Sequence, residues 1–143
     1  MEAKGRSSAS RCTVTGAERG GGRVTILYVE DDVETLKLVS SLISLKFPAV
    51  KLSTASDGES ALRMFDEHRP RILITDVAMP EIDGITLAHR IRLQAPETMI
   101  IAISALSREV ATTGSAQLFD YILQKPVKVA ELYSIVDACI ATL

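Results

Sequence analysis

Polar side chains that can do chemistry follow four of the five short apolar runs in this sequence. Three acids come first, and a fourth acid, a hydroxyl and an ammonium each follow a later run: Glu30, Asp31, Asp32, Asp76, Ser104 and Lys125. Adjacent carboxylates repel each other, and some of them take up protons unless a cation intervenes. A hard divalent ion such as Mg2+ accepts carboxylate oxygens and keeps several waters. If these side chains converge, the sequence predicts a magnesium site beside a hydroxyl and an ammonium.

This set of groups suits the transfer of a phosphoryl group. A carboxylate among a metal ion, a cation and a hydroxyl is a nucleophile toward phosphorus. Asp76 is the best candidate for that nucleophile, because it stands alone after its apolar run. Glu30 and Asp31 are better placed as metal ligands. Lys125 supplies a compact positive charge that neutralises phosphoryl oxygens in the transition state, and Ser104 offers a hydroxyl donor.

Each of these residues alone also has an ordinary structural interpretation. An acidic triplet after a strand is typical of a helix N-terminus, where acids favour the helix dipole, and Asp32 fits that role by itself. A single acid, serine or lysine in a loop is most often a solvated surface residue. The complete set, in order and at the ends of the runs, is much less expected by chance. It therefore favours the functional interpretation.

Five short apolar runs alternate with stretches in which apolar residues recur every three and four positions. The short runs contain many β-branched residues and predict strands over 25–29, 50–54, 72–75, 99–103 and 121–123. The longer stretches predict helices marked by apolar residues at Leu36 to Phe47, Ala61 to Phe65, Ile85 to Leu93 and Val129 to Ile140. A further helix over 107–118 is expected to be weak, because threonine, glycine and serine at 112–115 are poor helix formers.

The alternation predicts an α/β fold, a five-stranded parallel sheet with helices on both faces. In such sheets, ligands bind beyond the carboxyl ends of the strands, where the strand order reverses. The polar residues that follow the strands are therefore expected to converge at one edge of the sheet.

The 143 residues are enough for one domain and too few for two. Residues 1–23 hold five of the eight glycines and five basic residues against two acids, and they predict a disordered tail before a domain over 24–143. The net charge of −2 gives no general attraction to nucleic acid, and no apolar run could span a bilayer. The two cysteines form no disulfide framework and the N-terminus has no secretory pattern, which favours the cytoplasm.

The chain resembles the receiver domains of two-component response regulators over about residues 24–142. The resemblance rests on four segments: ILYVEDD at 26–32, ILITDVAMPEIDG at 72–84, ISA at 103–105 and KPV at 125–127. It implies the flavodoxin-like (βα)5 receiver fold. It also implies a signalling domain rather than an enzyme, which accepts a phosphoryl group from a histidine kinase or phosphotransfer protein and switches a protein-interaction surface.

The resemblance also implies a role for each position. Asp76 matches the aspartate that is phosphorylated. The implied ligands of Mg2+ are Glu30, Asp31, Asp76 and the backbone carbonyl of Ala78. Ser104 matches the switch residue that turns toward the phosphoryl group, and Lys125 matches the lysine that contacts it. Pro126 follows that lysine, in the family through a cis peptide bond.

Two features depart from the family's pattern. The family often has an aromatic residue three positions before the lysine, and here that position is Ile122, with Tyr121 one residue earlier. Two residues after Asp76 stands Ala78, and two residues after the switch serine stands Leu106. Because neither side chain can position a water molecule, we expect slow loss of the phosphoryl group. Phosphorylation is expected to reshape the face from 107 to 123.

Other functions of the same fold fit less well. An aspartyl-phosphate phosphatase needs a second acid two residues after its nucleophile, and a flavin carrier needs a glycine-rich phosphate loop after the first strand. In this chain Ala78 stands two residues after Asp76, and acids instead of glycines follow the first strand. A phosphorylation-independent protein-interaction module remains the alternative. The downstream protein target, pairing with a second copy, and membership of a larger protein are not fixed by the sequence.

Overall fold

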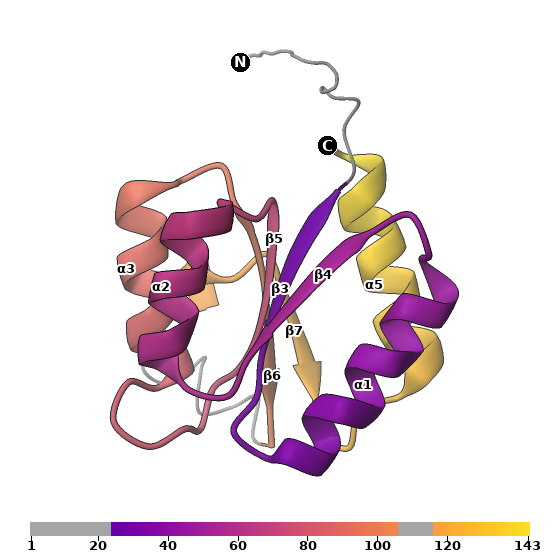
Figure 1. Cartoon of the computed structure of the whole chain (residues 1–143), viewed down its shortest axis with the longest axis horizontal. Helices are drawn as coiled ribbons and strands as arrows, with labels where there is room; N and C mark the ends of the chain where they lie inside the picture. Colours follow the sequence, from indigo (N-terminus) through magenta and orange to yellow (C-terminus); the bar gives the residue numbers. More distant parts are fainter. Residues whose placement is uncertain (1–23, 106–115) are drawn as a thin grey trace.

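A five-stranded parallel sheet lies between two layers of helices (Figure 1). A computed structural model describes residues 24–105 and 116–143 of the chain. In chain order its elements are β3 (Thr25–Val29), α1 (Val33–Lys46), β4 (Lys51–Ala55), α2 (Gly58–His68), β5 (Ile72–Asp76), α3 (Gly84–Gln94), β6 (Met99–Ser104), the 3-10 helix η1 (Ala116–Leu118), β7 (Tyr121–Gln124) and α5 (Val129–Ala141). The predicted α/β architecture is confirmed.

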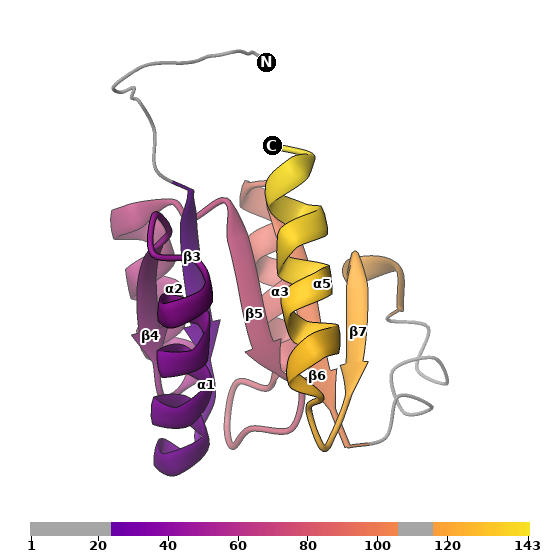
Figure 2. The same cartoon turned by 90° about the vertical axis from the view of Figure 1, so that its right-hand side faces the viewer.

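The strand order in the sheet is β4-β3-β5-β6-β7, and all neighbouring strands are parallel. After β3 the chain first adds β4 on one side and then crosses to β5 on the other side. The strand order therefore reverses between β3 and β5, which makes the carboxyl ends of these two strands the expected ligand site. All strand arrows end at the lower edge in Figures 1 and 2.

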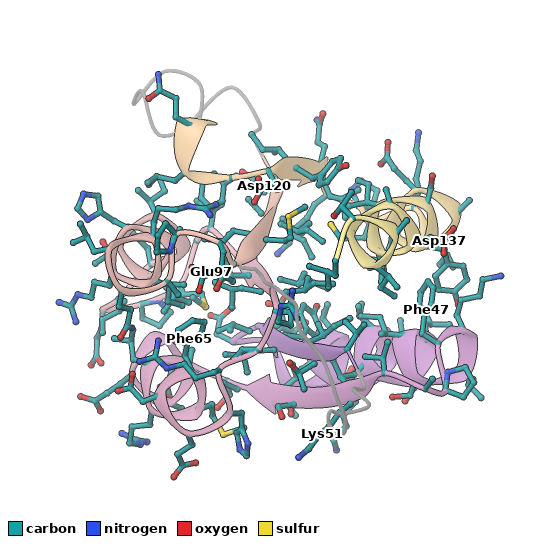
Figure 3. All side chains as sticks on the ribbon, turned by 90° about the horizontal axis from the view of Figure 1, so that it is seen from above. Phe47, Lys51, Phe65, Glu97, Asp120 and Asp137 are labelled. Atoms are coloured by element: carbon teal, nitrogen blue, oxygen red, sulfur yellow. The ribbon has the colours of Figure 1, made fainter. Side chains whose placement is uncertain are left out.

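Helices α1 and α5 cover one face of the sheet, and α2 and α3 cover the other (Figures 1 and 3). Successive strand residues point to opposite faces, so each strand contributes to both cores. The core under α1 and α5 contains Ile26, Tyr28, Val39, Ile43, Ile72, Ile74, Ile101, Ile103, Leu123, Leu132, Val136 and Cys139. The core under α2 and α3 contains Leu27, Val29, Ala61, Phe65, Leu73, Val77, Leu87, Ala88, Ile91, Ile100 and Ala102.

Each strand prediction agrees with the structure to within one residue at either end, and the helices lie where their apolar markers place them, although α1 and α2 begin three residues before the first marker. The second strand spans Lys51–Ala55 instead of 50–54. Leu93 and Val129 were counted as apolar markers of helix faces, but they are 76% and 41% exposed. The predicted tail over 1–23 lies outside the described residues, and so does most of the weak helix predicted over 107–118. Its described end, Ala116–Leu118, is a 3-10 helix.

The far end of the sheet, at the amino ends of the strands, is held by Arg92 near the end of α3. Its guanidinium donates hydrogen bonds to the carbonyl oxygens of Pro96, Thr98 and Leu118 and to Oδ2 of Asp120, at 2.7–3.1 Å. Asp120 lies just ahead of β7 (Figure 3). Arg92 thus ties α3 to the segment that leads into the edge strand.

Cys139 lies in α5, where its side chain is buried in the core, and it forms no disulfide. Burial, with a smaller contribution from the charge of Asp120, raises the pKa of its thiol to about 11. The thiol is therefore protonated at neutral pH. It is unpaired, as predicted, whereas Cys12 lies outside the described residues. None of the helices in the described part of the chain has the length and apolar character needed to cross a membrane.

Two helices that flank the carboxyl edge begin with an aspartate cap. Oδ1 of Asp57 accepts the backbone N–H of Ser60 at 2.7 Å, and Oδ1 of Asp83 accepts that of Thr86 at 2.8 Å. These bonds satisfy N–H groups that have no partner within the first turn of a helix. The hydrogen bond from Ser60 also holds the pKa of Asp57 below its usual value.

Replacing Asp57 with Ala is expected to lower the free energy of unfolding at pH 7 by about 1 kcal/mol, because the capping acceptor is lost. The variant Asp57→Asn keeps an acceptor and serves as the matched control. Since the pKa of Asp57 is lowered by folding, its charge contributes stability above the unfolded-state pKa and loses it as the pH falls through the folded-state pKa. Urea unfolding from pH 7 to pH 2 measures both effects, and equal stability of Asp57→Ala and the wild type at pH 7 would contradict them.

Candidate functional site

The carboxyl ends of four strands bring the predicted groups to one edge of the sheet. Glu30 and Asp31 follow β3, Asp76 ends β5, Ser104 ends β6, and Lys125 follows β7. The register explains why the acids meet. Residues 28 and 74 are partners across β3 and β5, and the acids at 30 and 76 each lie two positions further on. The convergence expected from the sequence is therefore present in the structure.

Three carboxylates form the centre of this edge. Glu30, Asp31 and Asp76 each place one oxygen so that all three oxygens lie within 4.8 Å of one another. Glu30 and Asp76 are buried, whereas Asp31 is exposed. The cluster is thus closed on the side of the sheet and open to solvent at Asp31.

Lys125 is the ammonium of this cluster. Its Nζ donates a hydrogen bond to Oδ2 of Asp76 at 2.9 Å and lies 3.9 Å from Oε1 of Glu30. Burial alone lowers the pKa of Lys125, but the hydrogen bond and the charge of Asp76, together with the charges of Glu30 and Asp31, raise the pKa above its usual value. The lysine is therefore a fixed positive charge at neutral pH. The peptide bond from Lys125 to Pro126 is cis, as the resemblance implied.

Glu30 has an unusual environment for a carboxylate. One oxygen, Oε2, accepts the backbone N–H of Asp32 at 3.2 Å, while the buried Oε1 has no hydrogen-bond partner among the described residues. Burial raises the pKa of Glu30 to about 7, and nearby Asp76 adds to this, while the N–H of Asp32 and the charge of Lys125 oppose it. Near neutral pH, a proton and a cation therefore compete for this carboxylate.

The donor set fits a magnesium ion. Carboxylate oxygens are ligands that Mg2+ prefers, and three of them lie within 4.8 Å of one another here. A divalent cation would add a second positive charge beside the buried carboxylate of Glu30, whose Oε1 has no hydrogen bond and lies 3.9 Å from the ammonium of Lys125. The opening at Asp31 leaves room for the waters that Mg2+ retains.

Asp76 is held at both of its carboxylate oxygens. Oδ2 accepts the hydrogen bond from Lys125, and Oδ1 accepts the backbone N–H of Ala78 at 3.3 Å. Position 78 thus adjoins the Asp76 carboxylate, and the role of its carbonyl oxygen as a metal ligand stays a prediction. The N–H of Ala78 is a contact that sequence reasoning did not predict.

Two glycines position the loop behind Asp76. The first residue of α3, Gly84, packs so closely on β5 that a Cβ there would lie 2.3 Å from the carbonyl oxygen of Asp76 and 2.7 Å from Cα of Val77. The first residue of α2, Gly58, would place a Cβ 2.6 Å from Cβ of Ile82 in the same loop. The sequence analysis predicted neither of these close approaches. The Asp-Gly pairs at the starts of both helices were the feature of the sequence from which these close contacts could have been predicted.

Ser104 is buried at the end of β6, and its backbone carbonyl accepts the N–H of Lys125 at 2.8 Å. The register of β7 shows which of Ile122 and Tyr121 lies on the same face of the sheet as Ser104. Ile122 is paired with Ala102 and packs into the same core, on the face to which Ser104 belongs, whereas Tyr121 packs into the opposite core. Leu106 and most of the predicted switch face lie outside the described residues.

Asp32 takes the ordinary role considered for it. It is the N-cap residue of α1 by position, but its side chain accepts no backbone N–H of the first turn and instead accepts a hydrogen bond from the hydroxyl of Thr35. Among its neighbours in the acidic triplet, Asp32 is therefore the one engaged in forming the helix start.

The family model for the response regulator receiver domain matches residues 26–137. An uncharacterized 14.6 kDa protein of Leptolyngbya boryana is 34% identical over 123 residues, which cover 83% of this chain and 92% of that protein. The transcriptional regulatory protein PrrA of Mycobacterium tuberculosis is 31% identical over 114 residues, covering 79% of this chain and 48% of PrrA. Six further curated relatives are likewise spanned over less than half of their length.

Solved structures show the same similarity. The response regulator protein TrrA from Thermotoga maritima, in complex with Mg(2+)-BeF, superposes with a TM-score of 0.72 at 28% identity, covering 80% of this chain and 97% of TrrA. The similarity thus includes the sheet and helices that form the acidic edge.

Proposed function

Because the chain belongs to the family of response regulator receiver domains, we propose that Asp76 accepts a phosphoryl group from a histidine kinase or a phosphotransfer protein. The observation that carries this proposal is the position of the Asp76 carboxylate. It lies 2.9 Å from the ammonium of Lys125 and within 4.8 Å of oxygens from Glu30 and Asp31. A nucleophile, a fixed positive charge and a place for a divalent cation therefore meet at one point.

In the proposed reaction, a carboxylate oxygen of Asp76 attacks phosphorus. The bond between phosphorus and the donor's imidazole nitrogen breaks, and its electron pair leaves with the imidazole. The new bond from the Asp76 oxygen to phosphorus makes an acyl phosphate. Lys125 already touches Asp76 and can follow the new phosphoryl oxygens as a point charge.

Four ligands would hold Mg2+ next to this carboxylate: Glu30, Asp31, Asp76 and the backbone carbonyl of Ala78. When bound, the ion neutralises charge on the phosphoryl oxygens. The acids themselves bind and orient the ion, because two of them are buried and fixed by the sheet.

The output of the reaction is a changed surface rather than a chemical product. Ser104 lies at the end of the strand beside β5, so its hydroxyl can turn toward a phosphoryl group on Asp76. That movement would alter the face over 107–123 and the binding of a downstream protein. In this proposal residues 24–143 form the receiver domain and residues 1–23 a tail. The protein acts in the cytoplasm and makes no direct contact with nucleic acid.

Intact-mass spectrometry after incubation with acetyl phosphate tests the proposal. With MgCl2 present, the chain should gain the mass of one phosphoryl group, and with EDTA in place of MgCl2 it should not. The added group should be lost at alkaline pH, as an acyl phosphate is. A chain that stays unlabelled at saturating acetyl phosphate and Mg2+ would instead be a phosphorylation-independent interaction module.

Replacing Ala78 with Asn is expected to shorten the lifetime of the phosphorylated chain by about tenfold, less than a full general base contributes. Ala78 adjoins the Asp76 carboxylate, and an amide there can orient a water toward phosphorus. The half-life is measured by intact mass after acetyl phosphate is removed. Ala78→Val, which adds bulk without a polar group, is the control, and an unchanged half-life in the Asn variant would count against the idea.

A further inference from the structure

Two polar side-chain atoms in the described part of the chain are buried without a hydrogen-bond partner, and they belong to residues two positions apart, one in β3 and one directly after it. They are the hydroxyl oxygen of Tyr28 and Oε1 of Glu30. Residues two positions apart along a strand point to the same face. A phenol is both donor and acceptor, whereas an ionised carboxylate only accepts. The two unpaired atoms are therefore chemically complementary.

The sheet places the Tyr28 ring beneath the acidic cluster. Tyr28 is fully buried in the core under α1 and α5, and its register partner is Ile74. Glu30 and Asp76 lie two residues beyond this pair, Glu30 directly after β3 and Asp76 at the end of β5. Burial first, and then the charges of Glu30, Asp76 and Asp32, raise the pKa of the phenol, which is consistent with a hydroxyl close below the carboxylates.

We propose that Tyr28 is a positioning residue of the metal site, whose hydroxyl donates a hydrogen bond to Oε1 of Glu30 when Glu30 ligates Mg2+. This inference rests on the metal site in the proposed function. Carboxylates that ligate metals are usually held by an outer hydrogen bond, and its loss typically weakens metal binding by about 10- to 100-fold. One hydrogen bond here would satisfy both orphaned atoms.

The remaining contacts of Glu30 explain why a further donor is needed. Oε2 has only the N–H of Asp32 at 3.2 Å, and Lys125 lies 3.9 Å from Oε1 while it donates to Asp76. If Lys125 moves with a phosphoryl group, Oε1 loses its nearest positive charge. The Tyr28 hydroxyl then fixes the orientation of the carboxylate from below.

The variant Tyr28→Phe removes the hydroxyl and keeps the ring that fills the core. The matched control is Tyr133→Phe, because the hydroxyl of Tyr133 donates to the carbonyl oxygen of Leu42 at 3.3 Å, away from the acids. Isothermal titration calorimetry with MgCl2 should give a Kd that is about tenfold higher for Tyr28→Phe than for the wild type. The Kd of Tyr133→Phe should be unchanged.

Tyrosine fluorescence gives a second readout that a purely structural role would not change. The chain has three tyrosines and no tryptophan, so tyrosine emission can be observed directly. Because a hydrogen bond to a carboxylate quenches a phenol, Mg2+ should lower the emission of the wild type and of Tyr133→Phe but not that of Tyr28→Phe.

Each result bears on the inference. An unchanged Kd for Tyr28→Phe, or equal weakening in both variants, overturns it, and so does a wild type that binds no Mg2+. A wild type that is labelled while Tyr28→Phe binds Mg2+ normally removes this inference and leaves the proposed function in place. If the wild type binds Mg2+ more tightly than Tyr28→Phe but is never labelled, this inference stands and the proposed function is overturned.

Discussion

Replacing Asp76 with Asn is expected to reduce the initial rate of labelling by acetyl phosphate and Mg2+ by at least about 100-fold, to background. The amide has no anionic oxygen that can attack phosphorus. The change also removes one of the three carboxylates that lie within 4.8 Å of one another, so Mg2+ would bind less tightly. Intact-mass spectrometry over time, with a series of MgCl2 concentrations, separates the loss of the nucleophile from weaker metal binding.

The variant Asp83→Asn is the matched control, because it makes the same chemical change at the other end of the loop. Asp83 accepts the N–H of Thr86 at 2.8 Å as the cap of α3, and asparagine caps helices about as well as aspartate. This variant should be labelled like the wild type. Labelling of Asp76→Asn at the wild-type rate would show that another residue receives the phosphoryl group, and peptide mapping would identify it.

The convergence of the site could be predicted because it depends on strand ends alone. The runs before Glu30 and Asp76 are apolar and β-branched, as strands buried on both faces are, and parallel strands end at one edge. A shift of one residue in a strand boundary, as in β4, moves no acid away from that edge. The predicted location of site residues that directly follow strands is therefore unaffected by an error of one residue in a strand boundary.

Features that depend on facing or on close approach could not be predicted in this way. Whether Tyr121 or Ile122 lies on the same face of the sheet as Ser104 depends on which residues of the short edge strand β7 point to that face. Only the register with β6 determines this. Tyr28 sits in an apolar run, where an aromatic residue is most simply read as core packing. Its proximity to Glu30 is visible from strand alternation, but the absence of another partner for its hydroxyl requires coordinates.

The variant Gly84→Ala is expected to lower the free energy of unfolding by about 3 kcal/mol, at the upper end of ordinary overpacking. A Cβ at this position would lie 2.3 Å from the carbonyl oxygen of Asp76 and 2.7 Å from Cα of Val77. Both neighbours are backbone atoms, so no side-chain rotation can relieve the contact. Either α3 must move away from β5, or the end of β5 must shift.

Helix propensity acts in the opposite direction, since alanine favours an interior helical position over glycine by about 1 kcal/mol. Thr86→Ala, at an exposed position two residues further along α3, therefore controls for propensity and should change stability little. Urea unfolding with and without MgCl2 measures the effect, and a Gly84→Ala variant as stable as the wild type would contradict it. Because the displaced backbone carries the Asp76 carboxylate, the stabilisation by Mg2+ should shrink in the same variant, which links the packing of α3 to the chemistry of the site.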